Sequence, residues 1–455
     1  MIKLRDKKEL ENYIGIEIYS TPEFEGINGL YKNDFKDFIV KEITANGTTL
    51  EIRGNYSTHS FLEGTKDRYT TFDLVKVNKD TFEAVRDLSK ALKISPKLIK
   101  YSGLKDKCSI SVQKISIKGN FVKELKKLKI KDIFAKNIAP TKKSVKMGAN
   151  WGNHFTIILR NIENKENLKE SIEKIFKKLT KCGFPNYFGI QRFGQYRPNS
   201  NRVGRFLLES AYEKAFNEFI TTIYSTESYE LQSIRQSFKK NESLEKSYEK
   251  FPKSLNYERS MIKHLINNPG DYKGCFETLP NDLKSLLVSA FQSYLFNKMI
   301  SLRVKKGIPL FKPVKGDVIS ILDDDKGHIT QIKYIYGKNR GKYDNFLEKA
   351  LKLNRAVIVI PIVGYNTDLN EFPLMKTLLE EIIKQEDISD TIFKSELLYL
   401  LEFKGSFRAM MVKPIGLKLI ELKDDDLFPG KKKVKIEVSL PKGSYATVLL
   451  RELIK

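Results

Sequence analysis

The sequence contains little cysteine and histidine and no long apolar run, and each shortage excludes a class of protein. The 3 cysteines lie far apart without a CxxC pair, and the 4 histidines show no metal-ligand spacing, so neither a structural zinc site nor a disulfide framework is expected. No apolar segment approaches the roughly 20 residues that span a bilayer, and residues 1–6 lack the apolar core of a secretion signal. The sequence therefore predicts a soluble, cytoplasmic protein without a metal site.

Positive charge is in clear excess. The chain has 455 residues, a length typical of two to four domains, and its 81 Lys and Arg against 56 Asp and Glu give a net charge of +25. A thermophile's surface would raise both signs together, whereas here the signs are unbalanced. Because neutralised phosphates release counterions, this charge favours a polyanionic partner, and a nucleic acid is expected.

Apolar periodicity predicts strands interspersed with helices, which is typical of an α+β fold. Strands are expected over 38–43, 70–77, 98–101, 110–117, 155–159 and 434–440. Helices are expected over 164–180, over 224–256 and from Ala290. Another is expected from Thr81, with one apolar face formed by Phe82, Val85, Leu88 and Leu92. Ser444 is placed to cap a final helix. The composition changes over residues 305–400, which indicates a separate module.

Two further segments are candidates for RNA contact. Residues 123–146 carry a dense lysine series, which fits either a solvated helix and loop or a rim that faces RNA. Residues 183–206 interleave aromatic side chains with arginines, which stack on bases and pair with phosphates. A structural glycine-rich loop held by cation–π contacts is the alternative for this second segment.

The most informative stretch is YSGLKDK at residues 101–107, which places Asp106 between two lysines on a glycine turn. A lone aspartate in a turn is most often a structural cap, because its side chain bonds nearby backbone donors. The lysines would favour the ionised carboxylate, which nucleophilic or electrostatic work requires. The turn alone leaves both interpretations open.

Several blocks, in order along the chain, resemble the signatures of the TruD family of tRNA pseudouridine synthases, and specifically its archaeal-type members. GLKDKCSISVQ from Gly103 resembles the family's GxKDxxAxTxQ, with Ser109 and Ser111 in place of its Ala and Thr. The other blocks are GLYK at 29–32 with DFIV at 37–40, GNHFTIILR at 152–160, PNYFGIQRFG at 185–194, and LPKGSYAT at 440–447 followed by Arg451 and Glu452.

This resemblance implies an isomerase that converts uridine to pseudouridine, with uridine 13 of tRNA as the expected target. Such enzymes break the C1′–N1 glycosidic bond, turn the uracil and rejoin it through C5. Asp106 matches the catalytic aspartate and would act as the nucleophile, with removal of a sugar proton as the alternative role. The reaction needs no redox change or high-energy input, so no cofactor is expected.

The resemblance also implies roles for other residues. Lys32 matches the lysine beside the catalytic carboxylate. The expected uracil pocket consists of Phe155 as the first stacking residue, Asn153 as the reader of the uracil edge, and Phe38, Phe188 and Tyr445. Packing within the fold is the alternative for Phe38 and Tyr445. The expected RNA contacts are Arg192, Arg197, Lys105 and Lys107.

By the same resemblance, the catalytic domain is a mixed, largely antiparallel central sheet with flanking helices, formed by residues 1–300 and 405–455. Residues 305–400 are expected to form an inserted α/β TRUD module, and the family's TRUD domain as a sequence unit would span about 186–411. The expected partner is tRNA, with no membrane and no small-molecule cofactor, and the chain is expected to be a monomer.

Two rival functions fit the same composition. A non-catalytic RNA-binding protein would keep its function after Asp106→Ala. A metal-dependent nuclease could use the acidic triplets 323–325 and 424–426, although solvated loops explain such triplets better.

Overall fold

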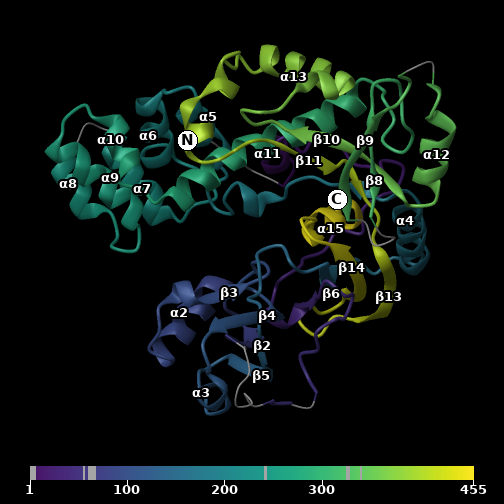
Figure 1. The fold of residues 1–455 in the computed structure, drawn as a ribbon, viewed down its shortest axis with the longest axis horizontal. Helices are drawn as coiled ribbons and strands as arrows, with labels where there is room; N and C mark the ends of the chain where they lie inside the picture. Colours follow the sequence, from purple (N-terminus) through teal and green to yellow (C-terminus); the bar gives the residue numbers. More distant parts are fainter. Residues whose placement is uncertain (1–6, 55–56, 60–67, 240–242, 324–327, 339–340) are drawn as a thin grey trace. The chain divides into compact units, whose positions relative to one another are not determined.

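The chain folds into two compact units, each assembled from separate segments. The computed structural model describes residues 7–54, 57–59, 68–239, 243–323, 328–338 and 341–455 (Figure 1). We call Thr21–Phe184 with Val412–Lys455 the sheet unit, and Met1–Ser20 with Pro185–Met411 the helical unit. Among the described residues, no helix is both long and apolar enough to cross a membrane.

An 8-stranded sheet forms the sheet unit, in the order β13-β14-β6-β1-β4-β2-β5, with β3 paired to β4. The β1–β4 pair is parallel and the other strand pairs described in this sheet are antiparallel, so the predicted mixed, largely antiparallel sheet is confirmed. The strands are β1 (Phe38–Ile43), β2 (Tyr69–Val77), β3 (Ile99–Tyr101), β4 (Ile110–Lys118), β5 (Ile133–Thr141), β6 (Gly152–Ile162), β13 (Ile415–Asp424) and β14 (Lys432–Pro441).

Short helices cover this sheet. Helix α2 (Thr81–Ala91) begins with a capping box from Asp80, and its buried side chains join a core with α3 (Val122–Lys126) and the strands β2, β4 and β5. Helix α4 (Leu168–Cys182) packs on β13, and α15 (Ala446–Ile454) follows β14. Phe82, expected on the apolar face of α2, is exposed instead, because Ala84 and Leu88 form the buried face.

The helical unit combines a helix bundle with a smaller sheet (Figure 1). Its helices are α1 (Lys7–Tyr13), α5 (Ser200–Leu208), α6 (Tyr212–Ile220), α7 (Tyr229–Lys239), α8 (Leu244–Lys250), α9 (Asn256–Asn267), α10 (Tyr272–Glu277), α11 (Asn281–Lys305), α12 (Asp344–Lys352), α13 (Pro373–Gln385) and α14 (Glu396–Leu400). The 4-stranded sheet runs β11 (Ser406–Ala409), β10 (Ala356–Ile362), β8 (Val318–Leu322) and β9 (Ile329–Ile335). Two short strands, β7 (Phe184–Pro185) and β12 (Met411–Val412), also pair.

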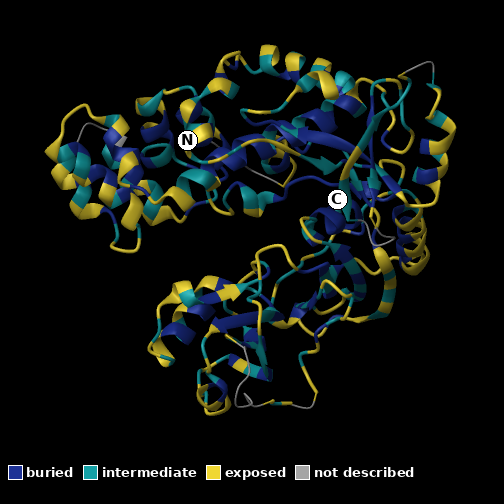
Figure 2. Cartoon of the chain, viewed as in Figure 1, coloured by how far each residue is buried: buried dark blue, intermediate teal, exposed yellow. Residues whose placement is uncertain are grey.

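Helix α11 runs through the core of the helical unit, as its long buried stretch in Figure 2 shows. Strand β10 and helix α13 both pack on it. Residues 305–400 therefore do not form a compact unit of their own, which differs from the module boundaries expected from the sequence. The unit that includes them takes in all of Pro185–Met411, because the elements of the expected module complete the core around α11.

The expected strands and most helices lie close to their predicted positions, but the helix expected from Ala290 begins at Asn281, and one cap differs. Ser444 does not cap the final helix: Tyr445 occupies the cap position, and the Ser444 hydroxyl donates to the Pro441 carbonyl oxygen at 2.5 Å. The polar stretch 224–256 does form helices, and α7 and α8 contribute partly buried apolar residues to the bundle core.

Candidate active site

Asp106 lies in an irregular turn, residues 102–109, that connects the antiparallel strands β3 and β4. We call these residues the Asp106 turn. Side chains from neighbouring elements replace the missing ladder hydrogen bonds: Gln113 Nε2 donates to the Gly103 carbonyl oxygen at 3.2 Å, and the Lys105 amide donates to Thr81 Oγ1 at 2.9 Å. Thr81 in turn donates to Gln113 Oε1 at 3.1 Å. The turn is therefore held from both β4 and α2.

The Asp106 carboxylate is accessible and paired. Its side chain is 45% exposed, and its Oδ2 accepts a hydrogen bond from the ammonium of Lys32, whose side chain is 17% exposed. Lys32 has φ +58°, in the left-handed region that non-glycine residues rarely adopt. The structure thus joins the two residues that sequence reasoning placed together, across 74 positions in the chain.

Two buried aromatic rings lie beside this ion pair. The Lys32 ammonium sits 4.6 Å from the centroid of the Phe38 ring, within the range of a cation–π interaction. Phe38 lies on β1, and its ring meets that of Phe155 on β6 edge to face, with centroids 5.9 Å apart. Both rings are buried, at 2% and 7% exposure. The four residues therefore form one continuous cluster, which we call the Asp106 cluster.

Asn153 lies two residues before Phe155 on β6, opposite Leu440 of β14. Its Oδ1 is buried, and among the described residues no group donates a hydrogen bond to it. Gly152 allows the strands to meet closely here, since a Cβ at this position would lie 2.1 Å from the Leu440 carbonyl oxygen. Tyr445 is half-buried and follows β14 by a short turn. A buried unpaired acceptor beside the cluster is suited to a ligand's N–H.

Arg160 fixes the segment that carries Lys32 and Phe38. Its backbone exchanges two hydrogen bonds with Leu30, each 2.8 Å long. Its buried guanidinium donates to both carboxylate oxygens of Asp37, at 2.9 and 2.8 Å, and to Asp425 at 2.9 Å. These bonds raise the pKa of Arg160 above its ordinary value, the Asp37 bond contributing most. The segment is held at both ends, so Lys32 and Phe38 keep their places.

Lys105 is buried and paired, which argues against the RNA contact expected for it. Its side chain is 3% exposed, and its ammonium pairs with Glu42 at 2.9 Å, itself 1% exposed. Glu42 also accepts from the Lys114 amide at 3.1 Å. A buried charge that is already paired cannot reach a phosphate without breaking the pair. Lys105 therefore secures the Asp106 turn to strand β1.

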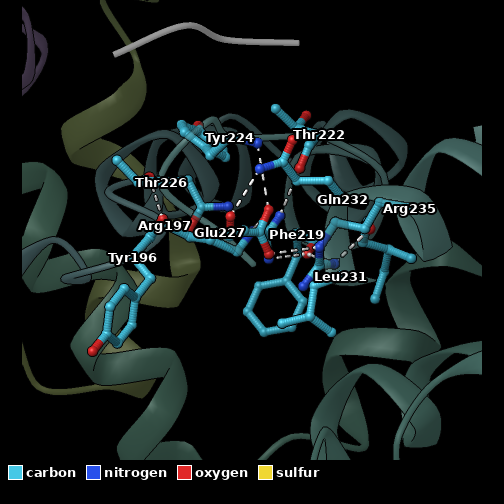
Figure 3. A network of polar contacts seen from close by, with 12 residues as sticks. Tyr196, Arg197, Phe219, Thr222, Tyr224, Thr226, Glu227, Leu231, Gln232 and Arg235 are labelled. Carbon is cyan, nitrogen blue, oxygen red and sulfur yellow. Dashed lines mark hydrogen bonds and ion pairs between the residues drawn. The ribbon is translucent and has the colours of Figure 1, made fainter. Parts of the chain in front are cut away.

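Arg197 is likewise a structural residue of the helical unit (Figure 3). Its guanidinium donates to three main-chain oxygens, of Phe219 at 2.7 Å and of Glu218 and Thr222 at 3.1 Å each, and it pairs with Glu227 at 3.3 Å. Burial lowers its pKa to about 10. Arginine–aromatic contacts recur in this segment, so the structural alternative for residues 183–206 describes Arg197 better than the RNA interpretation.

Three more of the predicted site residues have different settings. Lys107 is exposed and its ammonium pairs with Glu83 at 2.8 Å. Arg192 is partly exposed, and its guanidinium lies 5.8 Å from the Phe188 ring. Phe188 belongs to the helical unit, where its ring is buried against Phe296. A place for Phe188 in the uracil pocket stays a prediction, as do RNA contacts by Lys107 and Arg192.

A pocket of about 630 Å³ lies in the sheet unit, beside the start of the Asp106 turn. Ser102 and the Lys105 partner Glu42 line it. The exposed lysines Lys142, Lys143 and Lys146 line its outer side. The lysine series over 123–146 is thus divided between α3, β5 and this rim.

In the acidic triplet 424–426, two carboxylates are paired with an arginine rather than grouped as metal ligands. Asp425 and Asp426 both accept from the Arg160 guanidinium, at 2.9 and 3.0 Å. Burial raises the pKa of Asp425, but bonds from the Asn161 and Leu427 amides and from Arg160 hold it below the usual range. Bonds from Lys433 and then Arg160 hold the pKa of Asp426 below the usual range. Of the other triplet, only Asp323 is described, because residues 324–327 lie outside the described part of the chain.

The family assignment rests on the whole chain. The model of the family "tRNA pseudouridine synthase D (TruD)" matches residues 13–453. The chain belongs to the TruD family. Its members are pseudouridine synthases, which are isomerases, so the enzyme class expected from the motifs is confirmed.

Similar proteins cover the chain from end to end. A protein of Methanosarcina mazei named "Probable tRNA pseudouridine synthase D" is 36% identical over 98% of both chains. Namesakes from Methanocaldococcus jannaschii and Thermococcus sibiricus are 32% and 31% identical, over 96% and 95% of this chain and 97% and 96% of theirs. A crystal structure of a Methanosarcina mazei TruD protein superposes with a TM-score of 0.77, at 35% identity over 98% of both chains.

Within this TruD chain, sequence reasoning missed the residues that hold the Asp106 turn. Glu42 and Thr81 contact the turn directly. Glu42 gave a signal, since it alternates with Phe38 and Val40 on the buried face of β1, where an unpaired charge is costly. Thr81 gave none, because a threonine at the start of a helix is ordinary capping chemistry.

Proposed function

We propose that this chain converts uridine 13 of tRNA to pseudouridine, with Asp106 as the catalytic carboxylate. The observation that carries the proposal is the Asp106 cluster: an accessible carboxylate paired with Lys32, beside two buried aromatic rings. The family assignment supplies the reaction class, and the position in tRNA is part of the proposal. The chain would act as a cytoplasmic monomer.

The chemistry needs a carboxylate that reaches the ribose of a uridine taken out of its stack. As nucleophile, Asp106 Oδ attacks C1′, and the C1′–N1 bond electrons leave with the uracil. The freed uracil turns, its C5 bonds to C1′ as the Asp106 ester breaks, and the C5 proton is lost to a base while N1 ends protonated. As base, Asp106 would instead take a ribose proton. Both roles require the ionised carboxylate that the Lys32 pair accompanies.

The remaining residues would bind the extruded base and the RNA strand. Phe155 and Phe38 offer an aromatic wall, and stacking on such a wall contributes roughly 1–3 kcal/mol per base. The unpaired Asn153 Oδ1 is suited to the N3–H of uracil. Tyr445 would contribute to the proposed pocket, and a place for Phe188 in it stays a prediction from the family motif. Lys107, Arg192 and the lysines at the 630 Å³ pocket would pair with phosphates of the flanking strand.

The deciding experiment is tritium release from tRNA labelled at C5 of uridine, with mapping of the modified position. Each turnover replaces the C5–H bond, so we expect release by the wild type and modification at position 13. Asp106→Asn should lower the rate by at least about 10³-fold, because it removes the only group proposed to react with the sugar. Asp87→Asn, which alters an aspartate on α2 that pairs with Lys79, is the matched control and should keep most activity.

Two outcomes would contradict the proposal. Wild-type protein that releases no tritium from any tRNA would overturn the function, and a fully active Asp106→Asn variant would overturn the role of Asp106. Modification at another position would overturn only the choice of target.

A further inference from the structure

Lys76 on β2 is a buried lysine that none of the motifs includes. Its side chain is fully buried, at 0% exposure. Its ammonium donates to the carbonyl oxygens of Lys79, of Lys105 at 3.3 Å and of Asp106 at 3.0 Å. One cation in the sheet core therefore contacts the backbone of the residue proposed to react with the sugar.

The two carbonyls in the turn belong to the peptide groups on either side of the Asp106 Cα. The Lys105 carbonyl belongs to the preceding peptide and the Asp106 carbonyl to the following one. Binding both with one ammonium limits φ and ψ of Asp106, and thereby the direction of its Cα–Cβ bond. Ser109 Oγ adds a second bond to the Asp106 carbonyl at 2.8 Å. In a turn without ladder partners, such bonds decide the backbone conformation.

A buried lysine is an expensive way to satisfy two carbonyls, so its charge is informative. A buried cation is tolerated only with compensating partners. Burial lowers the pKa of Lys76 to about 8, and the negative charges of Asp106, Asp80 and Glu83 oppose this shift while Lys105 adds to it. An uncharged donor would satisfy carbonyls at lower cost, which indicates that the positive charge beside Asp106 is itself useful.

We propose that Lys76 is a positioning residue: it fixes the backbone of Asp106 and supplies positive charge beneath its carboxylate. This inference rests on the proposed function of Asp106. Lys32 and Lys76 then divide the task, since Lys32 pairs with the carboxylate itself and Lys76 with the main chain on the buried side.

The proposal predicts how turnover depends on pH. Below about pH 8 the ammonium has three protons for three carbonyls and carries its charge. Above it, the neutral amine loses the charge and one donor, so turnover should fall as pH rises through about 8. The charged groups that face Lys76 are Asp106, Asp80, Glu83 and Lys105. Lys76→Arg keeps the charge at all these pH values and should remove this decline.

Stability should follow the opposite course. The pKa of Lys76 is lower in the folded chain than its ordinary value of 10.5, so folding carries a penalty below about pH 8. That penalty is relieved as pH rises from about 8 toward 10.5, where the unfolded chain loses its proton too. A loss of turnover over the same range therefore cannot be attributed to unfolding.

The test compares Lys76→Met with Lys136→Met by tritium release, tRNA affinity and thermal denaturation. Lys136 is also buried, at 2% exposure, but it lies on β5 opposite Asp73 rather than at the turn. We expect Lys76→Met to lower kcat about 10- to 100-fold, the loss of a hydrogen bond to a charged group. Its tRNA Kd should stay within about threefold, because no RNA contact is removed. Lys136→Met should keep its kcat.

The outcomes distinguish failure of this inference from failure of the proposed function on which it rests. An active wild type with a fully active Lys76→Met, or with a kcat loss no larger than that of Lys136→Met, overturns the role of Lys76 alone. A Lys76→Arg variant with an unchanged alkaline decline overturns it as well, even where Lys76→Met does not fold. An inactive wild type overturns the proposed function and this inference with it.

Discussion

At the scale of single residues, the presence of a charged side chain did not predict whether it is buried or exposed. The ion-pair partner available in the fold determines that. Lys105 and Lys107 are neighbours in the same motif, yet Lys105 is buried against Glu42 while Lys107 is exposed beside Glu83. The family motif includes both Asp106 and Lys32 and placed them together, and the structure pairs their side chains. The sequence could not assign Lys105 or Arg197, because their partners lie 63 and 30 positions away in the chain, and pattern reading does not reach so far.

Arg197 provides a test of whether a buried, paired charge stabilises the fold or contacts RNA. Arg197→Met removes one donor from each of three main-chain oxygens and one of the two arginine partners of buried Glu227. We expect the free energy of unfolding to fall by about 3–5 kcal/mol, the usual loss when one partner of a buried ion pair is removed. Thermal or urea denaturation of the variant measures the change, and tRNA affinity of the folded protein should stay within about threefold.

Lys143→Ala is the matched comparison, because Lys143 is an exposed lysine at the rim of the 630 Å³ pocket. It should weaken tRNA binding while leaving stability unchanged. An Arg197→Met protein of normal stability with weak tRNA binding would restore the RNA interpretation of this residue.

At the scale of elements, apolar periodicity predicted the positions of the strands well. It did not predict which apolar side chains of a helix are buried, because close packing determines that. Strand β14 was predicted from the alternation of Val434, Ile436, Val438 and Leu440, and all four are buried. The face of α2 was predicted less well, because Phe82 fits the apolar period and yet is exposed. A helix on the edge of a small core buries only part of its apolar arc, and a sequence does not reveal how wide that part is.

The crossing of α5 and α11 depends on close packing at a glycine. A Cβ on Gly204 would lie 2.1 Å from the Leu287 carbonyl oxygen, and backbone cannot yield as a flexible side chain does. Gly204→Ala should therefore lower the free energy of unfolding by about 1–3 kcal/mol, the typical cost of overpacking, as chemical denaturation can measure. Leu286→Ala, at an exposed position on α11, should change it by less than about 0.5 kcal/mol. Equal stability of the two variants would contradict the close approach.

At the scale of the whole molecule, the net charge of +25 should make RNA binding strongly dependent on salt. Counterion release predicts that log Kd rises linearly with log salt concentration, so tRNA affinity should fall at least about 10-fold between 50 and 200 mM. The kcat at saturating tRNA should change little, because it reports the chemical step, in which the Asp106–Lys32 pair acts, and not the binding of tRNA. Filter binding and tritium release over a salt series measure both.

Lys143→Ala should reduce the salt slope by about one. A flat salt dependence would show that the positive excess serves something other than RNA.

The discontinuous sheet unit has a consequence for biosynthesis. Strand β14 lies beside β6 in the finished sheet, yet it follows β6 in the chain only after all of Pro185–Met411 has been made. On the ribosome, β6 must therefore wait with an unpaired edge, which is the kind of surface that attracts other strands. Leu440, the neighbour of Asn153, arrives with β14. A nascent or prematurely terminated chain thus holds Asp106 and Lys32 without a complete site, and it cannot modify RNA before synthesis has passed this strand.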